Sequence, residues 1–119
     1  MDRWVAVVRP GKQKMDTTIA KGLAPGARRY TLYLQLRNGI ESLEIGVVKG
    51  ETFRSLAPSN ERPMVFYGSS IINGACASRP GMALPSILGR RLRRPIMNRG
   101  CAGNGRVEIA GGSLVAAHE

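Results

Sequence analysis

Two glycine-rich loops hold the residues whose chemistry is most distinctive in this chain. The first loop begins with Gly68-Ser69-Ser70, directly after the apolar run Pro63–Tyr67. The second loop surrounds Gly103 and follows the shorter run Pro95–Asn98. A serine hydroxyl at a tight turn after a strand can act as a nucleophile, and backbone N–H groups can stabilise the oxyanion of an acyl-transfer intermediate. Gly-Ser-Ser is also common in ordinary loops, so this pattern by itself leaves acyl transfer as a hypothesis.

A β–loop–α–β unit would bring these two loops together. Pro63–Tyr67 is continuously apolar, as expected of a strand covered on both faces of a parallel sheet. Apolar residues at helical spacing predict a helix over Ala83–Arg93, and Pro95–Asn98 is the next short strand. Parallel strands end at one edge of the sheet, where ligands bind in α/β proteins. We therefore expect Ser70 and Gly103 to lie close together.

The first half of the chain instead predicts short strands joined by turns. Arg29–Leu36 and Ser42–Val47 alternate apolar and polar residues on either side of Asn38-Gly39, a strong hairpin signal. We expect these segments to pair antiparallel, with an apolar face that needs a partner sheet because an isolated hairpin is marginal in water. Two shorter strand candidates precede them, Trp4–Val8 and Thr17–Ala20.

These elements predict an α/β fold in a chain of 119 residues, which leaves room for one domain or less. An antiparallel β-hairpin or sandwich remnant at 1–50 would precede a polar linker at 51–62. One parallel βαβ unit would occupy 63–119. A hydrophobic content of 43% is typical of globular chains.

The formal net charge is +10, which raises the question of binding to phosphate. The one dense basic cluster is Arg90, Arg91, Arg93 and Arg94. The aromatic residues are not interleaved with this cluster, as a stacking platform for a single strand would require. The pattern argues against a nucleic-acid binder and favours an arginine-rich surface, or one that faces an acidic partner.

Metal ligands are sparse. With two cysteines, one histidine and Asp2 and Asp16 as the only aspartates, we expect no metal site and no cofactor. Cys76 and Cys101 are either small buried or half-buried side chains or a disulfide pair, and the choice depends on geometry.

No targeting segment is evident. Asp2 and the brevity of the apolar run Trp4–Val8 do not fit a signal peptide, and no apolar run approaches the roughly 20 residues that span a bilayer. We expect no membrane association, and the cytoplasm is the default compartment.

The residues around both loops resemble the SGNH/GDSL hydrolases. Val65–Ala83 resembles their first conserved block, and Cys101–Gly105 resembles the second. Arg29–Leu34 and Asn38–Val47 resemble the closing strands of an N-terminal β-sandwich domain found in a bacterial subgroup of the family. The resemblance extends from about Trp4 to Arg106. It implies a flavodoxin-like three-layer fold and ester hydrolysis through an acyl-serine intermediate. Small-molecule or carbohydrate esters would be the substrates of full-length relatives.

The resemblance also implies roles for individual residues. Ser70 matches the nucleophile, and its backbone amide matches one oxyanion donor. Gly103 matches the glycine that supplies the other oxyanion amide. Ser69 stands where many relatives have Asp or Thr. Cys101 and Ala102 stand where an aromatic residue and Ser are frequent, so the substrate pocket is expected to differ.

Two further parts of the family's catalytic set have no match in this sequence. Asn104 belongs to the second block and does not replace the asparagine of the third block. His118 is not preceded by Asp at the third position before it, which is Val115, and a terminal histidine is typically solvated. A serine without a base is a poor nucleophile, so we expect a fragment that is inactive or nearly so by itself. Uncovered sheet edges would favour self-association, and a non-catalytic interaction module is the alternative.

Overall fold

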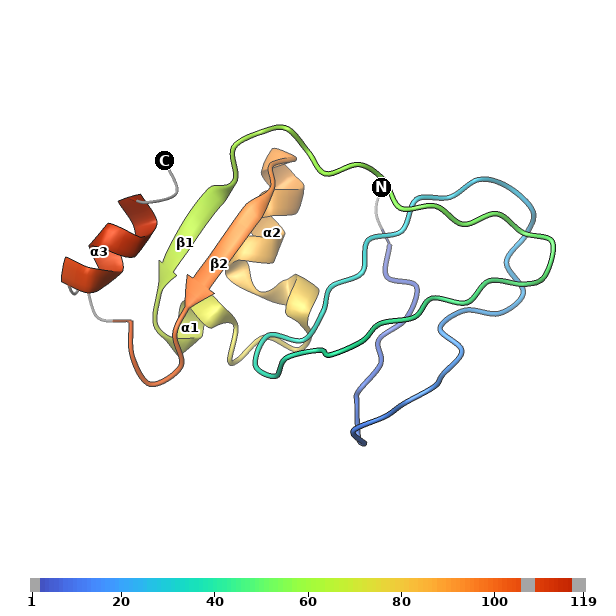
Figure 1. Cartoon of the computed structure of the whole chain (residues 1–119), viewed down its shortest axis with the longest axis horizontal. Helices are drawn as coiled ribbons and strands as arrows, with labels where there is room; N and C mark the ends of the chain where they lie inside the picture. The colour runs from blue at the N-terminus through green and yellow to red at the C-terminus, as the bar shows by residue number, and fades with distance from the viewer. Residues whose placement is uncertain (1–2, 106–108, 117–119) are drawn as a thin grey trace. The chain divides into compact units, whose positions relative to one another are not determined.

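The computed structural model describes residues 3–105 and 109–116, and its chain divides into two units, 1–32 and 33–119 (Figure 1). In the first unit, residues 3–32 contain no helix or strand. The strands predicted over Trp4–Val8 and Thr17–Ala20 are therefore not formed. Side chains such as Trp4 (45% exposed) and Val7 (56%) face solvent, so burial supplies little energy to hold these segments as strands.

The antiparallel hairpin predicted from Arg29–Leu36 and Ser42–Val47 is likewise absent from the described residues. Leu34 and Leu43 are 45% and 54% exposed. The two segments alternate apolar and polar residues as a strand does, but no second sheet among the described residues covers their apolar face. A hairpin without such cover is marginal in water. The domain limits at 50 and 63 remain a prediction.

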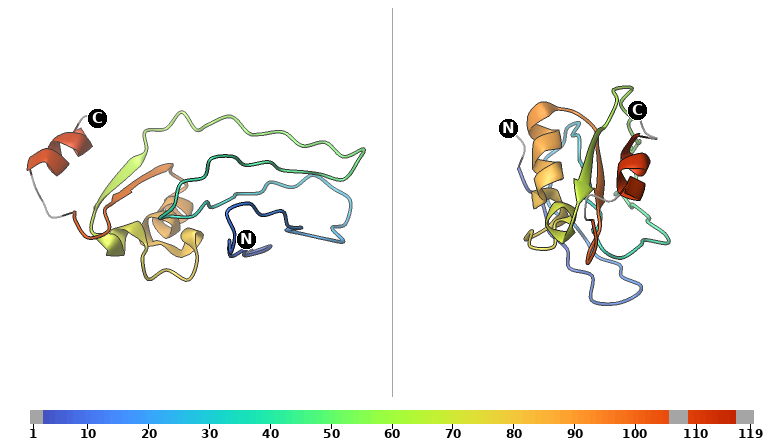
Figure 2. Two further views of the ribbon diagram at one scale, coloured as in Figure 1. Left: turned by 60° about the horizontal axis from the view of Figure 1, so that its bottom comes forward. Right: turned by 90° about the vertical axis from the view of Figure 1, so that its left-hand side faces the viewer.

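The second unit contains all the regular elements that the structure describes. In chain order these are β1 (Met64–Gly68), α1 (Ser70–Asn73), the 3₁₀ turn η1 (Pro80–Met82), α2 (Leu84–Leu92), β2 (Ile96–Gly100) and α3 (Ile109–Ala116). β1 and β2 pair in parallel, with Met64 opposite Ile96 and Gly68 opposite Gly100. The predicted βαβ unit and the α/β class are confirmed. Figure 2 shows α2 and α3 on opposite faces of this two-stranded sheet.

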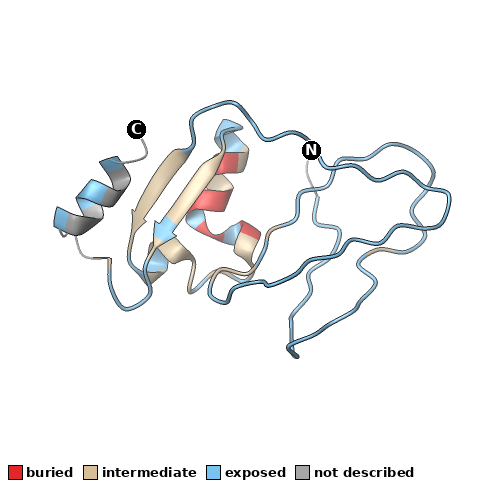
Figure 3. Ribbon diagram, viewed as in Figure 1, coloured by how far each residue is buried: buried red, intermediate tan, exposed pale blue. Residues whose placement is uncertain are grey.

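Helix α2 forms where the apolar spacing predicted it. Its residues Pro85, Ser86 and Gly89 are buried (Figure 3). Pro85 lies in its first turn, where a missing N–H costs no hydrogen bond. A Cβ on Gly89 would lie 2.7 Å from Ile96 Cγ2, so glycine allows the helix to approach β2 closely. The helix ends at Arg93, which adopts the left-handed conformation with φ 53°.

Helix α1 was not predicted, because its four residues are too few for a periodic pattern. Local hydrogen bonds define it instead. The Ser69 hydroxyl accepts the Ile71 N–H at 3.4 Å at its start. At its end Gly74, with φ 102°, donates its N–H to Ser70 O and Ile71 O.

Candidate active site

Ser70 occupies the first position of α1, two residues beyond the end of β1. Ser69, with extended backbone angles, caps the helix through its hydroxyl. The Ser70 side chain is half-buried, whereas Ser69 is exposed. Among the described residues, the Ser70 hydroxyl has no hydrogen-bond partner. The serine thus stands at a strand-to-helix turn at the carboxyl edge of the sheet, where the sequence predicted it.

Gly103 lies in a four-residue turn after β2. The Asn104 N–H donates to Cys101 O at 3.3 Å and closes this turn, in which Gly103 is the third residue. Its φ of 79° is the value that a type II turn requires at that position and that glycine adopts without strain. A Cβ at Gly103 would meet nothing within 4 Å, so the turn borders open space.

Both ends of the second loop lie against the first. The Cys101 N–H donates to Gly68 O at 2.8 Å at the start of the loop. At its end, a Cβ on Gly105 would overlap Gly68 O and lie 2.9 Å from Ser69 N. The loop therefore begins and ends in contact with residues 68–69, and Gly103 lies between these two contacts in the sequence.

The side-chain amides of two asparagines link the same loops. The sequence did not predict this link. Asn98 in β2 donates from Nδ2 to Ile72 O at 3.1 Å and Asn73 O at 3.3 Å. Asn73 at the end of α1 donates from Nδ2 to Gly100 O at 3.1 Å. A sequence signal was present, because each asparagine follows an apolar stretch near the expected loops.

The two cysteines are free and exposed. Neither the disulfide pair nor the buried filler expected for Cys76 and Cys101 is therefore formed. Both residues lie in loop or turn backbone outside the helices and strands, where the small core does not reach.

Two arginines of the basic cluster, Arg90 and Arg94, make structural contacts away from the Ser70 turn. Arg94, just before β2, pairs with Glu61 at 3.1 Å and donates to Arg62 O at 2.8 Å. Arg90 lies over the Tyr33 ring, 5.3 Å from its centroid, and donates to Gly81 O. The exposed Arg94–Glu61 pair contributes little to stability, but it occupies the guanidinium.

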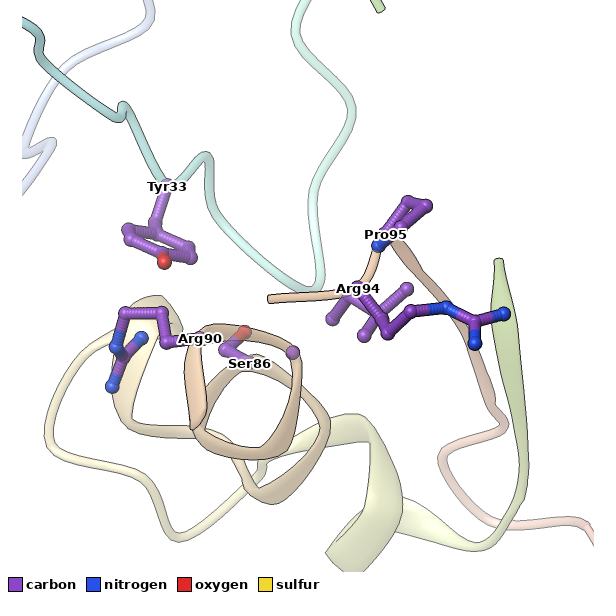
Figure 4. Close-up of a pocket in the computed structure, with 7 residues that line it drawn as sticks. Tyr33, Ser86, Arg90, Arg94 and Pro95 are labelled. Atoms are coloured by element: carbon purple, nitrogen blue, oxygen red, sulfur yellow. The ribbon is translucent and has the colours of Figure 1, made fainter. Parts of the chain in front are cut away.

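A shallow cavity of about 210 Å³ lies beside these arginines (Figure 4). Its mainly apolar wall consists of Tyr33, Ser86, Gly89, Arg90, Arg94, Pro95 and Ile96. Figure 4 shows Tyr33 and Pro95 on opposite sides, with the Arg94 side chain directed away toward β1. Because Pro95 precedes β2 and Cys101 follows it, this cavity lies at the opposite end of the strands from Ser70.

The described residues contain no group of three or more histidine, cysteine, aspartate or glutamate side chains arranged to hold a metal ion. Within the same part of the chain, no helix has the length and apolarity that crossing a membrane requires. His118 lies outside the described residues.

A parallel βαβ unit with a serine turn after one strand and a glycine turn after the next is an arrangement typical of α/β serine hydrolases. Residues 61–119 match the sequence profile of the GDSL-like lipase/acylhydrolase family. This part of the chain belongs to that family. Neither the curated proteins nor the solved structures that were searched gave a match.

Proposed function

We propose that this chain supplies the nucleophile and two oxyanion amides of an ester hydrolase, from Ser70 and Gly103. The observation that carries the proposal is the attachment of both ends of the loop 101–105 to residues 68–69. That attachment supports a position of the Gly103 turn near the Ser70 hydroxyl. Among the described residues, the Ser70 and Gly103 N–H groups have no acceptor, so both can donate to an oxyanion.

In the proposed reaction, the Ser70 Oγ attacks the carbonyl carbon of an ester while its proton passes to a general base. The carbonyl oxygen becomes the oxyanion. The bond to the alcohol oxygen then breaks, and the alcohol leaves with that proton. Water attacks the resulting acyl-serine, which releases the carboxylic acid and restores the hydroxyl. Acylated carbohydrates and small esters are the proposed substrates. The exposure of Ser69, Gly103 and Asn104 supports access by a bulky molecule.

The sequence does not supply a general base in the Asp-x-x-His arrangement that the family uses. The one histidine, His118, lacks an aspartate three residues before it. We therefore expect the chain by itself to turn over esters slowly or not at all. An external base such as imidazole should raise the reactivity of Ser70.

The experiment is covalent labelling with a fluorophosphonate, which reports nucleophilic serines, with the modified residue located by mass spectrometry. Labelling at Ser70 should accelerate with added imidazole and disappear in Ser70→Ala. The matched control Ser69→Ala removes the neighbouring hydroxyl and should still be labelled, although loss of the cap costs about 1 kcal/mol of stability. Absence of label at Ser70, or equal labelling at Ser69 and Ser70, would contradict the proposed role.

We infer that residues 1–50 derive from the accessory β-domain of the bacterial subgroup and that 51–62 are a linker. Their alternating pattern supports this inference.

The second candidate function is a non-catalytic interaction module. It is favoured by the many large apolar side chains that are exposed outside the βαβ unit, among them Trp4, Leu43 and Phe53. Self-association through these residues should appear as a molar mass that rises with concentration in light scattering after gel filtration. A monomer at every concentration would contradict it.

A further inference from the structure

The side-chain amides of Asn73 and Asn98 form a link between the helix that begins at Ser70 and the loop that contains Gly103. We propose that these two asparagines are positioning residues, which fix the nucleophile turn relative to the oxyanion turn. The inference rests on the proposed function, because it assigns the purpose of a structural link at that same site.

Asn98 contacts both sides of the link. Its Nδ2 donates to Ile72 O and Asn73 O in the last turn of α1, at 3.1 and 3.3 Å. Its Oδ1 accepts the Gly100 N–H at 3.0 Å. One amide therefore connects the end of α1 to the residue at which β2 becomes the second loop.

Asn73 completes the connection from the opposite side. Its Nδ2 donates to Gly100 O at 3.1 Å and makes a longer bond of 3.5 Å to Leu36 O. The backbones are also in direct contact, because a Cβ on Gly100 would overlap Asn73 N. Gly100 is thus bound through its N–H by Asn98 and through its carbonyl by Asn73.

One polar atom of this arrangement has no hydrogen-bond partner. Asn73 Oδ1 is buried and has no hydrogen-bond partner among the described residues. A buried acceptor without a donor is unfavourable. Asn73 retains this penalty while both of its donor contacts are made.

The link acts over a short distance. Ser70 and Asn73 are the two ends of α1, and the four-residue helix spans only about 5 Å. A shift of Asn73 relative to Gly100 therefore shifts Ser70 relative to the loop 101–105. Misplacement of reacting groups by about 1 Å can reduce a rate by about 100-fold.

The test compares Asn98→Asp and Asn73→Asp with the matched control Asn60→Asp, at an exposed position outside the helices and strands. The aspartates keep the shape and acceptor oxygens but remove the N–H donors. Asn98→Leu removes the donors, and also the acceptor of the Gly100 N–H, without adding charge. Each variant is measured for the folded fraction by urea titration, for the rate of fluorophosphonate labelling at Ser70 with imidazole, and for amide exchange at Cys101.

We expect labelling to fall by about tenfold to 100-fold in the Asn98 and Asn73 variants under conditions in which they are folded. Exchange at the Cys101 N–H, which bonds to Gly68 O, should accelerate in the same variants, and Asn60→Asp should behave as the unmodified chain. If one variant fails to fold, the other two give the result.

Labelling of folded variants at the unmodified rate would overturn the positioning role and leave the proposed function intact. Labelling that falls only in proportion to the folded fraction would also overturn it, because a purely stabilising role predicts that result. A chain in which Ser70 is never labelled would refute the proposed function and, with it, this inference.

Discussion

At the scale of single residues, the site depends on glycines where two backbones touch. Gly105 adopts φ 92°, and a Cβ there would lie 2.5 Å from the Gly68 carbonyl carbon. The nearest atoms at this position are backbone atoms, which cannot rotate away as a side chain can. The contact that keeps the second loop against the Ser70 turn therefore leaves no room for any other residue.

We predict that Gly105→Ala destabilises the chain by about 2 to 3 kcal/mol, from the backbone strain and the overlap together. The loop should also move away from Ser69, so labelling of Ser70 should fall. Urea unfolding and the labelling rate measure the two effects separately.

Gly112→Ala in α3 is the matched control, because a Cβ there would meet nothing within 4 Å. This exposed helical position should become more stable by about 0.5 to 1 kcal/mol. Equal effects of the two substitutions would contradict the role assigned to the close approach at Gly105.

At the scale of elements, the sequence predicted what local patterns determine. β1, α2 and β2 were expected from an apolar run and from helical spacing, and the structure contains all three within one or two residues of the predicted limits. The parallel pairing followed from the helix between the strands. Each of these elements could be predicted because the pattern of its own residues is sufficient to indicate it.

Sequence reasoning was wrong about one hairpin and did not predict helix α1. The hairpin over Arg29–Val47 required a second sheet, which an alternating pattern cannot guarantee. Helix α1 depends on a Ser69 cap and a left-handed Gly74 rather than on periodicity. A similar reason explains why Ser70 and Gly103 were predicted as site residues and the bonds made by Asn73 and Asn98 were not. The first pair stands in recognisable loop motifs, whereas the second pair acts through bonds between two packed elements.

At the scale of the whole molecule, the compact second unit begins at Tyr33, well before the family match at 61. Tyr33 stacks on Arg90, and Leu36 accepts a bond from Asn73. A Cβ on Gly74 would lie 2.7 Å from Leu36 Cδ1, so the Leu36 side chain lies against the end of α1. The upstream segment is thus part of the structure that supports the site.

We predict that a chain starting at Tyr33 unfolds at the same urea concentration as the full chain. A chain starting at Glu61 should lose about 1 to 3 kcal/mol, from the cation–π contact and the covered Leu36 side chain. Urea titrations followed by circular dichroism make the comparison. Equal stability of all three chains would show that the segment 33–36 contributes nothing.

The register of the sheet has a consequence for how this protein can change over time. Gly68 stands opposite Gly100 in the last pair of the ladder, and α1 lies against both positions. A Cβ on Gly68 would lie 2.7 Å from Ile72 Cγ1, and one on Gly100 would overlap Asn73 N. Every missense change of a glycine codon adds a Cβ. We therefore expect that a missense change at either position is not tolerated. The surrounding loops can change in sequence during evolution while these two glycines are retained.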